Sequence, residues 1–196
     1  MEKAHILFKE FSDFISNQDI ELAQPMLKVI SFKQNDLLLK EGEVCTFIYF
    51  IIQGVALNTI LEHSKERVVH ASFEGEFSFA LYSFYSQKPS EVYIRALTDM
   101  EVVGIDYKNV QILYDKSKNW ERVGRIFAER TLIESLRAKY DIQHKTAHYR
   151  YNKLIGQRPE ILQLLSLGQI ADILGISQET LNRMSLFSSY PTERFL

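Results

Sequence analysis

The sequence has little cysteine and no long apolar run, and each shortage excludes a class of protein. Cys45 is the one cysteine among 196 residues, which excludes an internal disulfide framework and an all-cysteine zinc or iron–sulfur site. The longest apolar run, FIYFII, is far shorter than the roughly 20 residues of a transmembrane helix. The N-terminal residues lack the basic and then apolar pattern of a signal peptide. We therefore expect a cytoplasmic globular protein.

The chain also lacks a strong excess of charge of either sign, because its net charge is −2. The charge is unevenly distributed, with −4 over residues 1–143 and +2 over residues 144–196. A weakly basic C-terminal part on an acidic body is compatible with a nucleic-acid partner, although +2 is small for a DNA-binding patch.

Motifs for catalysis and metal binding are missing as well. We find no phosphate-binding Walker loop, no nucleophile paired with a base in a recognisable motif and no set of metal ligands. His144 and His148 are four residues apart, but no carboxylate or thiol joins them within a turn or two. We expect neither an enzyme nor a bound metal or cofactor.

Short β-type runs dominate the chain from about residue 29 to residue 106, and helical periodicity flanks them. Turn formers separate the runs VISF, DLLLKEG, TFIYFIIQG, VALNTIL, RVVHASF, EVYIRAL and MEVVGID. Many short strands at close spacing predict a sandwich or barrel. Before them, residues 5–15 have helical spacing and Ser16 is placed to cap a short helix. After residue 107 the helical period returns.

One long, highly charged helix is predicted from about residue 119 to residue 143. A narrow apolar stripe runs along it, formed by Val123, Ile126, Ile133, Leu136 and Tyr140. A stripe this narrow favours a two-fold dimer seam. The alternative is that the stripe packs on the chain's own β-domain.

Two short helices joined by a turn are predicted near the C-terminus, in SLGQIADILGISQETLNRM. Ser166 and Gln169 form an S-x-x-Q capping box at the first helix start, and Gly175 lies at the turn. Ile170, Leu174, Ile176, Leu181 and Met184 fall at the buried positions of a helix-turn-helix. A helical hairpin with a solvated polar face is the alternative.

The second of these helices, capped by Ser177, would expose side chains suited to the major groove of DNA. Arg183 can bind guanine, Glu179 can accept from cytosine and Gln178 can pair with adenine. Serine and threonine hydroxyls and the helix N-terminus can hold phosphates.

The order of these parts resembles that of the cyclic-AMP receptor protein/fumarate-nitrate regulator (Crp/Fnr) family of bacterial transcription factors. The matching motifs are FEGEF, EVYIRAL and GISQETLNR, and the resemblance covers essentially the whole chain. It implies an α+β fold with a cyclic-nucleotide-binding-like β-roll of the jelly-roll type (residues 1–118), a dimerisation helix (119–143) and a helix-turn-helix domain (144–196). It also implies a homodimer on a near-palindromic site of double-stranded DNA, with RNA polymerase as a further candidate partner.

The recognition helix keeps most of the family pattern. By the resemblance, Glu179 and Arg183 are base readers, Gln178 replaces an arginine, and Ser166 and Thr180 touch phosphates.

The effector pocket implied by the resemblance lies in FEGEFSFALYSFYSQKPSEVYIRAL, which we call the cassette (residues 73–97). The Gly-Glu turn at Glu76 opens it. Cyclic-nucleotide-binding relatives have a Gly-Glu pair for the ribose where this chain has Phe79 and Ala80, and an Arg-Ser pair for the phosphate where it has Ser90 and Glu91. A carboxylate beside the phosphate would oppose binding by kilocalories per mole. We therefore do not expect cAMP to bind.

Three interpretations of the cassette remain. Its crowded aromatic side chains favour a closed core without ligand. A different and more apolar small effector is the second interpretation. In the third, Lys88 replaces the missing cation, although a lysine beside Pro89 is more simply a solvated charge.

The C-terminal segment SLFSSYPTERFL is apolar where relatives commonly add arginine and lysine. Few phosphate contacts predict weak DNA binding with a shallow salt dependence. Leu186, Phe187 and Tyr190 are expected to pack on the small domain. The alternative function is a small-molecule-binding or scaffold module that has lost operator recognition.

Overall fold

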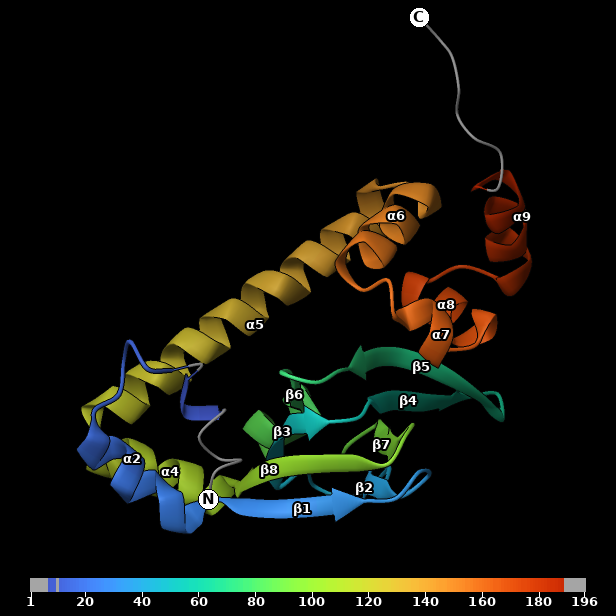
Figure 1. The fold of residues 1–196 in the computed structure, drawn as a ribbon. Coiled ribbons are helices and arrows are strands. Elements are labelled where there is room, and N and C mark those ends of the chain that lie inside the picture. Colours follow the sequence, from blue (N-terminus) through green and yellow to red (C-terminus); the bar gives the residue numbers. More distant parts are fainter. Residues whose placement is uncertain (1–6, 10, 189–196) are drawn as a thin grey trace, which may run out of the picture. The chain divides into compact units, whose positions relative to one another are not determined.

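The computed structural model describes residues 7–9 and 11–188. The chain divides into two compact units, Met1–Thr131 and Leu132–Leu196, and the boundary falls inside the long helix α5 (Lys118–His144). Each unit is described by itself below. Figure 1 gives the labels of the helices and strands.

The first unit is built from two four-stranded antiparallel sheets, as the alternating runs predict. One sheet has the order β1-β8-β3-β6, and its strands are Lys28–Phe32, Met100–Asp106, Phe47–Gln53 and Phe77–Ser78. The other has the order β2-β7-β4-β5, and its strands are Leu37–Leu39, Tyr93–Ala96, Ala56–Glu62 and Lys65–Ser72. The predicted β-sandwich followed by a long helix is confirmed.

The core of this unit lies between the sheets and follows the two-residue alternation of the strands. Ile51 and Val102 are paired neighbours on β3 and β8, and both are completely buried in the inner cluster. The adjacent pair Phe50 and Val103 points to the opposite face and packs in a second cluster. Successive residues of β3 therefore pack in two different hydrophobic clusters, because side chains alternate between the two faces of a sheet.

The second cluster is formed with N-terminal residues and the start of α5. It includes Leu7, Phe11, Trp120 and Val123. Around it lie α2 (Asn17–Ala23), the 3-10 turn η1 (Gln24–Met26) and α4 (Tyr107–Lys116). The predicted N-terminal helical segment is confirmed only in part, because residues 7–9 are helical but residues 11–14 form a turn.

A buried carboxylate fixes this helical layer. Ser16 caps α2 as predicted, in a capping box completed by Asp19. Asp19 also accepts hydrogen bonds from Ser117 Oγ (2.5 Å) and Asn119 Nδ2 (2.8 Å) at the start of α5. Burial opposes its charged form, but these hydrogen bonds outweigh burial and hold the pKa of Asp19 well below its usual value. Asp19 thereby ties α2 to α5.

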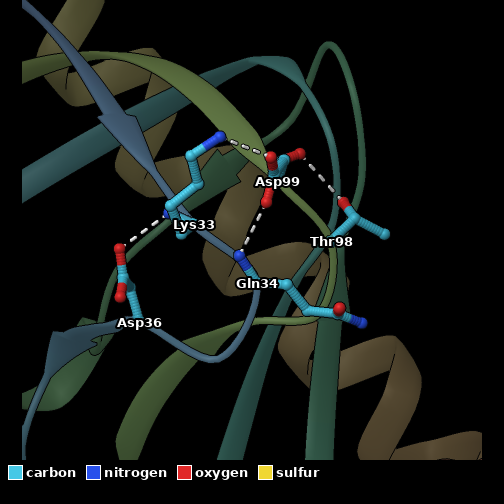
Figure 2. A network of polar contacts seen from close by, with 5 residues as sticks. All are labelled: Lys33, Gln34, Asp36, Thr98 and Asp99. Atoms are coloured by element: carbon cyan, nitrogen blue, oxygen red, sulfur yellow. Dashed lines mark hydrogen bonds and ion pairs between the residues drawn. The ribbon is translucent and has the colours of Figure 1, made fainter.

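A polar network joins two of the connections by which the chain crosses between the sheets, β1 to β2 and β7 to β8 (Figure 2). Lys33 and Gln34 follow β1, whereas Thr98 and Asp99 link β7 to β8. Asp99 pairs with Lys33 Nζ (2.8 Å) and accepts from the Gln34 amide (2.9 Å), while Asp36 accepts from the Lys33 amide (2.7 Å). These groups are exposed, so the network orders the turns but contributes little stability.

The second unit is entirely helical in its regular structure. After the end of α5 come α6 (Ala147–Gln157), α7 (Ile161–Leu164), α8 (Leu167–Leu174) and α9 (Gln178–Ser188). His144 ends α5 and His148 belongs to α6, so these two histidines do not share one helix. The predicted packing of Leu186, Phe187 and Tyr190 lies outside the side chains that the structure describes.

Candidate functional site

The cassette begins with a turn whose glutamate is engaged locally. Gly75 has a φ of +82°, a conformation that favours glycine, and Glu76 follows it. The half-buried Glu76 accepts a hydrogen bond from the Phe73 amide through Oε2 (2.9 Å). Its carboxylate therefore supports the turn that leads into β6.

Aromatic packing occupies the positions where relatives have the ribose-binding pair. The Phe79 ring lies 5.7 Å from that of Phe84 on α3 (Leu81–Ser86) and 5.9 Å from that of Phe127 on α5. Ala80 is buried and has no side-chain group to bind a hydroxyl; its amide donates to Cys45 Sγ (3.4 Å). These two positions thus contribute to packing and offer a ribose no carboxylate.

Ser90 and Glu91, which the resemblance places where relatives hold a phosphate, differ in exposure. Ser90 is buried, and its hydroxyl donates to the Val92 carbonyl (2.7 Å) while its amide donates to the Glu43 carbonyl (2.9 Å). Glu91 and Lys88 are exposed. The Lys88 carbonyl accepts from Ser83 Oγ (2.5 Å), which holds the loop against α3. The hydroxyl that could face a phosphate is therefore engaged within its own loop.

One interior residue of the roll, Asn58, is not singled out by the sequence reasoning. Asn58 on β4 is buried and donates from Nδ2 to the Phe79 carbonyl (3.3 Å), so it links β4 to the cassette. A single asparagine inside the apolar run VALNTIL was the available signal. Cys45 is also buried in the roll, and burial raises the pKa of its thiol and so disfavours the reactive thiolate.

The apolar stripe predicted on the long helix divides into two parts. Val123 is buried in the cluster formed with Trp120, so it packs within its own unit and is not available to a partner helix. Ile126 is half-buried. By contrast, the exposed fractions of Ile133, Leu136 and Tyr140 are 65%, 58% and 50%. Leu132, which the sequence reasoning did not include, is exposed beside them.

Local capping accounts for the geometry of α8 and α9. Ser166 and Gln169 form the predicted capping box at the start of α8. Gly175 ends α8 in the left-handed conformation (φ +63°), and the Ile176 amide donates to the Ala171 carbonyl (3.0 Å), which together turn the chain sharply. Ser177 Oγ then accepts from the Thr180 amide (3.1 Å) at the start of α9.

Buried and exposed side chains of α8 and α9 separate largely as predicted for a packed helix pair, except that Ile176 and Met184, predicted at buried positions, are half-buried. The buried ones are Ile170, Ala171, Leu174 and Leu181. Gln178, Glu179 and Arg183 are exposed, together with the capping residues Ser166 and Ser177. Thr180 is half-buried, and its hydroxyl lies 2.9 Å from that of Ser177. These six residues, which we call the α9 surface, offer one cation, one carboxylate, an amide and hydroxyls at the start of α9 and at the N-cap of α8.

Two searches of the described residues complete the geometry. Residues 7–9 and 11–188 contain no group of three or more His, Cys, Asp or Glu side chains arranged to hold a metal ion. Within the same ranges, every helix is too short or too polar to cross a membrane.

Comparison with known proteins supports the sequence-based resemblance. Residues 29–117 match the model of the cyclic nucleotide-binding domain family. No curated protein sequence matches the chain.

Several solved structures share the fold. FixK2 from Bradyrhizobium japonicum is 15% identical, with a TM-score of 0.70 over 86% of this chain and 90% of that one. A protein from Eubacterium rectale, assigned to the Crp/Fnr family of transcriptional regulators, is 15% identical, with a TM-score of 0.69 over 90% and 85%. The c-di-GMP responsive global regulator CLP from Xanthomonas campestris is 18% identical, with a TM-score of 0.63 over 88% and 92%. The resemblance is thus confirmed: residues 29–117 match the cyclic nucleotide-binding domain family, and the chain has the fold of the Crp/Fnr regulators.

Proposed function

We propose that the chain is a homodimeric, DNA-binding transcription regulator of the Crp/Fnr type whose roll does not bind cAMP. The α9 surface is the observation that carries the proposal, because a capped helix pair exposes base-reading side chains beside hydroxyls and a helix N-terminus. Relatives of the same fold are described as regulators. The proposal assigns the chain no catalytic reaction.

In this proposal α8 and α9 form a helix-turn-helix, and α9 enters the major groove. Arg183 and Glu179 are the principal base readers, since both are exposed. Gln178 lies against the first turn of α8, where a Cβ on Gly168 would be 3.5 Å from Gln178 Oε1. Ser166, Ser177 and Thr180 hold phosphates through their hydroxyls.

The homodimer forms along the exposed part of α5. Ile133, Leu136 and Tyr140 follow a three-then-four spacing, which places them on one side of a helix, and a second copy would bury them. The buried Val123 and the half-buried Ile126 lie outside this seam or at its margin. A two-fold seam presents two copies of α9 to a near-palindromic site.

The cassette acts as closed packing in this proposal. The ribose acceptor and the phosphate cation are replaced by Phe79, Ala80, Ser90 and Glu91, and the Phe79 ring packs between α3 and α5. A cyclic nucleotide would have to displace this ring and approach an exposed carboxylate without a compensating cation. We therefore expect titration calorimetry of the purified chain with cAMP to show no binding.

Selection from random duplexes tests the function. The chain should enrich a near-palindromic sequence, and its affinity should fall with salt by a slope below that of eight phosphate contacts, at roughly 0.9 log unit per contact. A steeper slope would contradict the weak binding expected from the small basic charge.

The second candidate function is a ligand-binding or scaffold module of the same fold. The net charge of +2 over residues 144–196 favours it, because few cations are present to hold a duplex. A selection that enriches no sequence would support this candidate and reject the regulator. Contact with RNA polymerase remains a prediction of the regulator alone.

A further inference from the structure

The second unit contains both the exposed seam of α5 and the α9 surface. In the proposed dimer, the distance between the two copies of α9 therefore depends on how the end of α5 is joined to α8 and α9. The covalent link is short: α5 ends at His144 and α6 begins at Ala147. A link of so few residues has several accessible conformations unless other contacts restrain it.

Arg150 on α6 supplies these contacts. Its Nη1 donates to the carbonyls of Lys145 (2.7 Å) and Ile142 (3.5 Å), at the end of α5. Its Nε donates to the carbonyl of Leu174 (3.1 Å), the last residue of α8. One half-buried guanidinium thus bridges the C-terminal ends of two helices.

The chemistry of these acceptors suits arginine. Carbonyls in the last turn of a helix have no partner within the helix, and the helix dipole makes this end negative. A guanidinium is always charged and carries five donors in a rigid planar fork, so it can serve several carbonyls at fixed angles. A lysine ammonium carries equal charge but lacks the fork.

The restraint continues from α8 to the reading helix. Leu174 is followed by the turn residues 175–177, after which α9 begins. Leu174 and Leu181 are both buried, which packs α9 on α8. A second tie fixes α6 to α5, since Lys153 Nζ lies 2.5 Å from the carboxylate of the buried Asp141.

We infer that Arg150 is a positioning residue that sets the angle between α5 and α9, and thereby the spacing of the two half-sites that a dimer prefers. This inference rests on the proposed function. Arg150 needs no contact with DNA for this role. Its loss should leave base reading by α9 intact and weaken the discrimination between spacings.

The test compares spacing preference with half-site binding. Wild type, Arg150→Ala, Arg150→Lys and Arg158→Ala are each titrated with the selected duplex, with duplexes one base pair longer or shorter between half-sites, and with a single half-site. Arg158→Ala is the matched control, because Arg158 is also at α6 and pairs with Glu160 (3.6 Å). Circular dichroism reports whether each variant is folded.

We expect Arg150→Ala to lower the preference for the selected spacing about tenfold, with half-site affinity changed less than about twofold. Arg150→Lys should fall between Arg150→Ala and wild type, and Arg158→Ala should keep the wild-type spacing preference.

Different failures have different meanings. If Arg150→Ala keeps the wild-type preference, the inference is overturned while the proposed function stands. If circular dichroism shows that Arg150→Ala is unfolded, the inference is tested with Arg150→Lys instead. An unchanged spacing preference in folded Arg150→Lys then overturns the inference. If wild type selects no duplex, the proposed function and the inference fail together.

Discussion

The cassette of the first unit and the α9 surface of the second unit both carry short polar motifs, but they use their polar groups differently. In the cassette, Glu76 bonds the Phe73 amide and Ser90 bonds the Val92 carbonyl. On α9, Glu179 and Arg183 are exposed on a helix that other residues cap. The comparison shows that the Ser90 hydroxyl has already donated its proton within its own loop, whereas the capping hydroxyl of Ser166 accepts from the backbone and can still donate to a ligand.

The largest effect is expected from placing a charge in the seam of α5. Leu136→Asp should weaken dimerisation by at least about 100-fold, because two apolar side chains lose their burial and two carboxylates would be desolvated. Sedimentation equilibrium measures this, and operator affinity should fall in parallel. Ser135→Asp adds the same charge at an exposed neighbouring position off the stripe and should leave the dimer intact. A monomeric wild type would remove the basis for the seam.

The next effect tests the α9 surface directly. Arg183→Ala should cost about 1–3 kcal/mol of binding free energy per half-site and relax the preference at one base pair. Fluorescence anisotropy with the selected duplex and its single-base variants measures both. A uniform loss across all sequences would instead identify Arg183 as a phosphate contact.

A third prediction tests whether the cassette is closed by packing. Phe79→Ala should lower the free energy of unfolding of the first unit by about 2 kcal/mol, because the half-buried ring contacts Phe84 and Phe127. Urea unfolding followed by the fluorescence of Trp120, the one tryptophan, measures this. Tyr82→Ala, on the adjoining helix α3, removes an exposed ring and should change the free energy by less than about 0.5 kcal/mol. Equal effects of the two changes would argue against a filled interior.

The smallest effect concerns the acid dependence of the first unit. The pKa of Asp19 is held below the usual value of about 4, so its contribution is present at neutral pH and is lost as the pH falls below about 4. Asp19→Asn should destabilise the unit by about 1 kcal/mol at pH 7, and the difference from wild type should shrink at pH 3. Asp13→Asn, at an exposed position, is the control. A difference that does not depend on pH would contradict the role of the charge.

Much of the fold could be predicted from local signals. The predicted helix cap at Ser16 and the predicted capping box at Ser166 depend on residues three positions apart, and both are present. The strands between residues 28 and 106 follow from β-type runs and turn formers. Such features are visible because their causes lie within a few residues.

Features that depend on distant contacts could not be predicted in the same way. Val123 fits the apolar stripe in sequence, but the N-terminal residues Leu7 and Phe11 pack in the cluster that buries it. Asn58 contacts a carbonyl 21 residues away, and Arg150 contacts one 24 residues away. The periodicity of one helix does not reveal which other segments cover it. The predicted stripe on α5 is therefore longer than its exposed part, because Val123 is buried within its own unit.

The division of α5 between the two units also bears on how such a protein can evolve. The seam and the reading helix lie on the C-terminal side of Thr131, whereas the aromatic side chains of the cassette lie on the other side. Under our proposal, the residues that set the spacing between half-sites therefore belong to a different unit from the residues that once would have held a ligand in the roll. Under our proposal, a lineage could lose its signalling molecule while its descendants continued to recognise ancestral promoters.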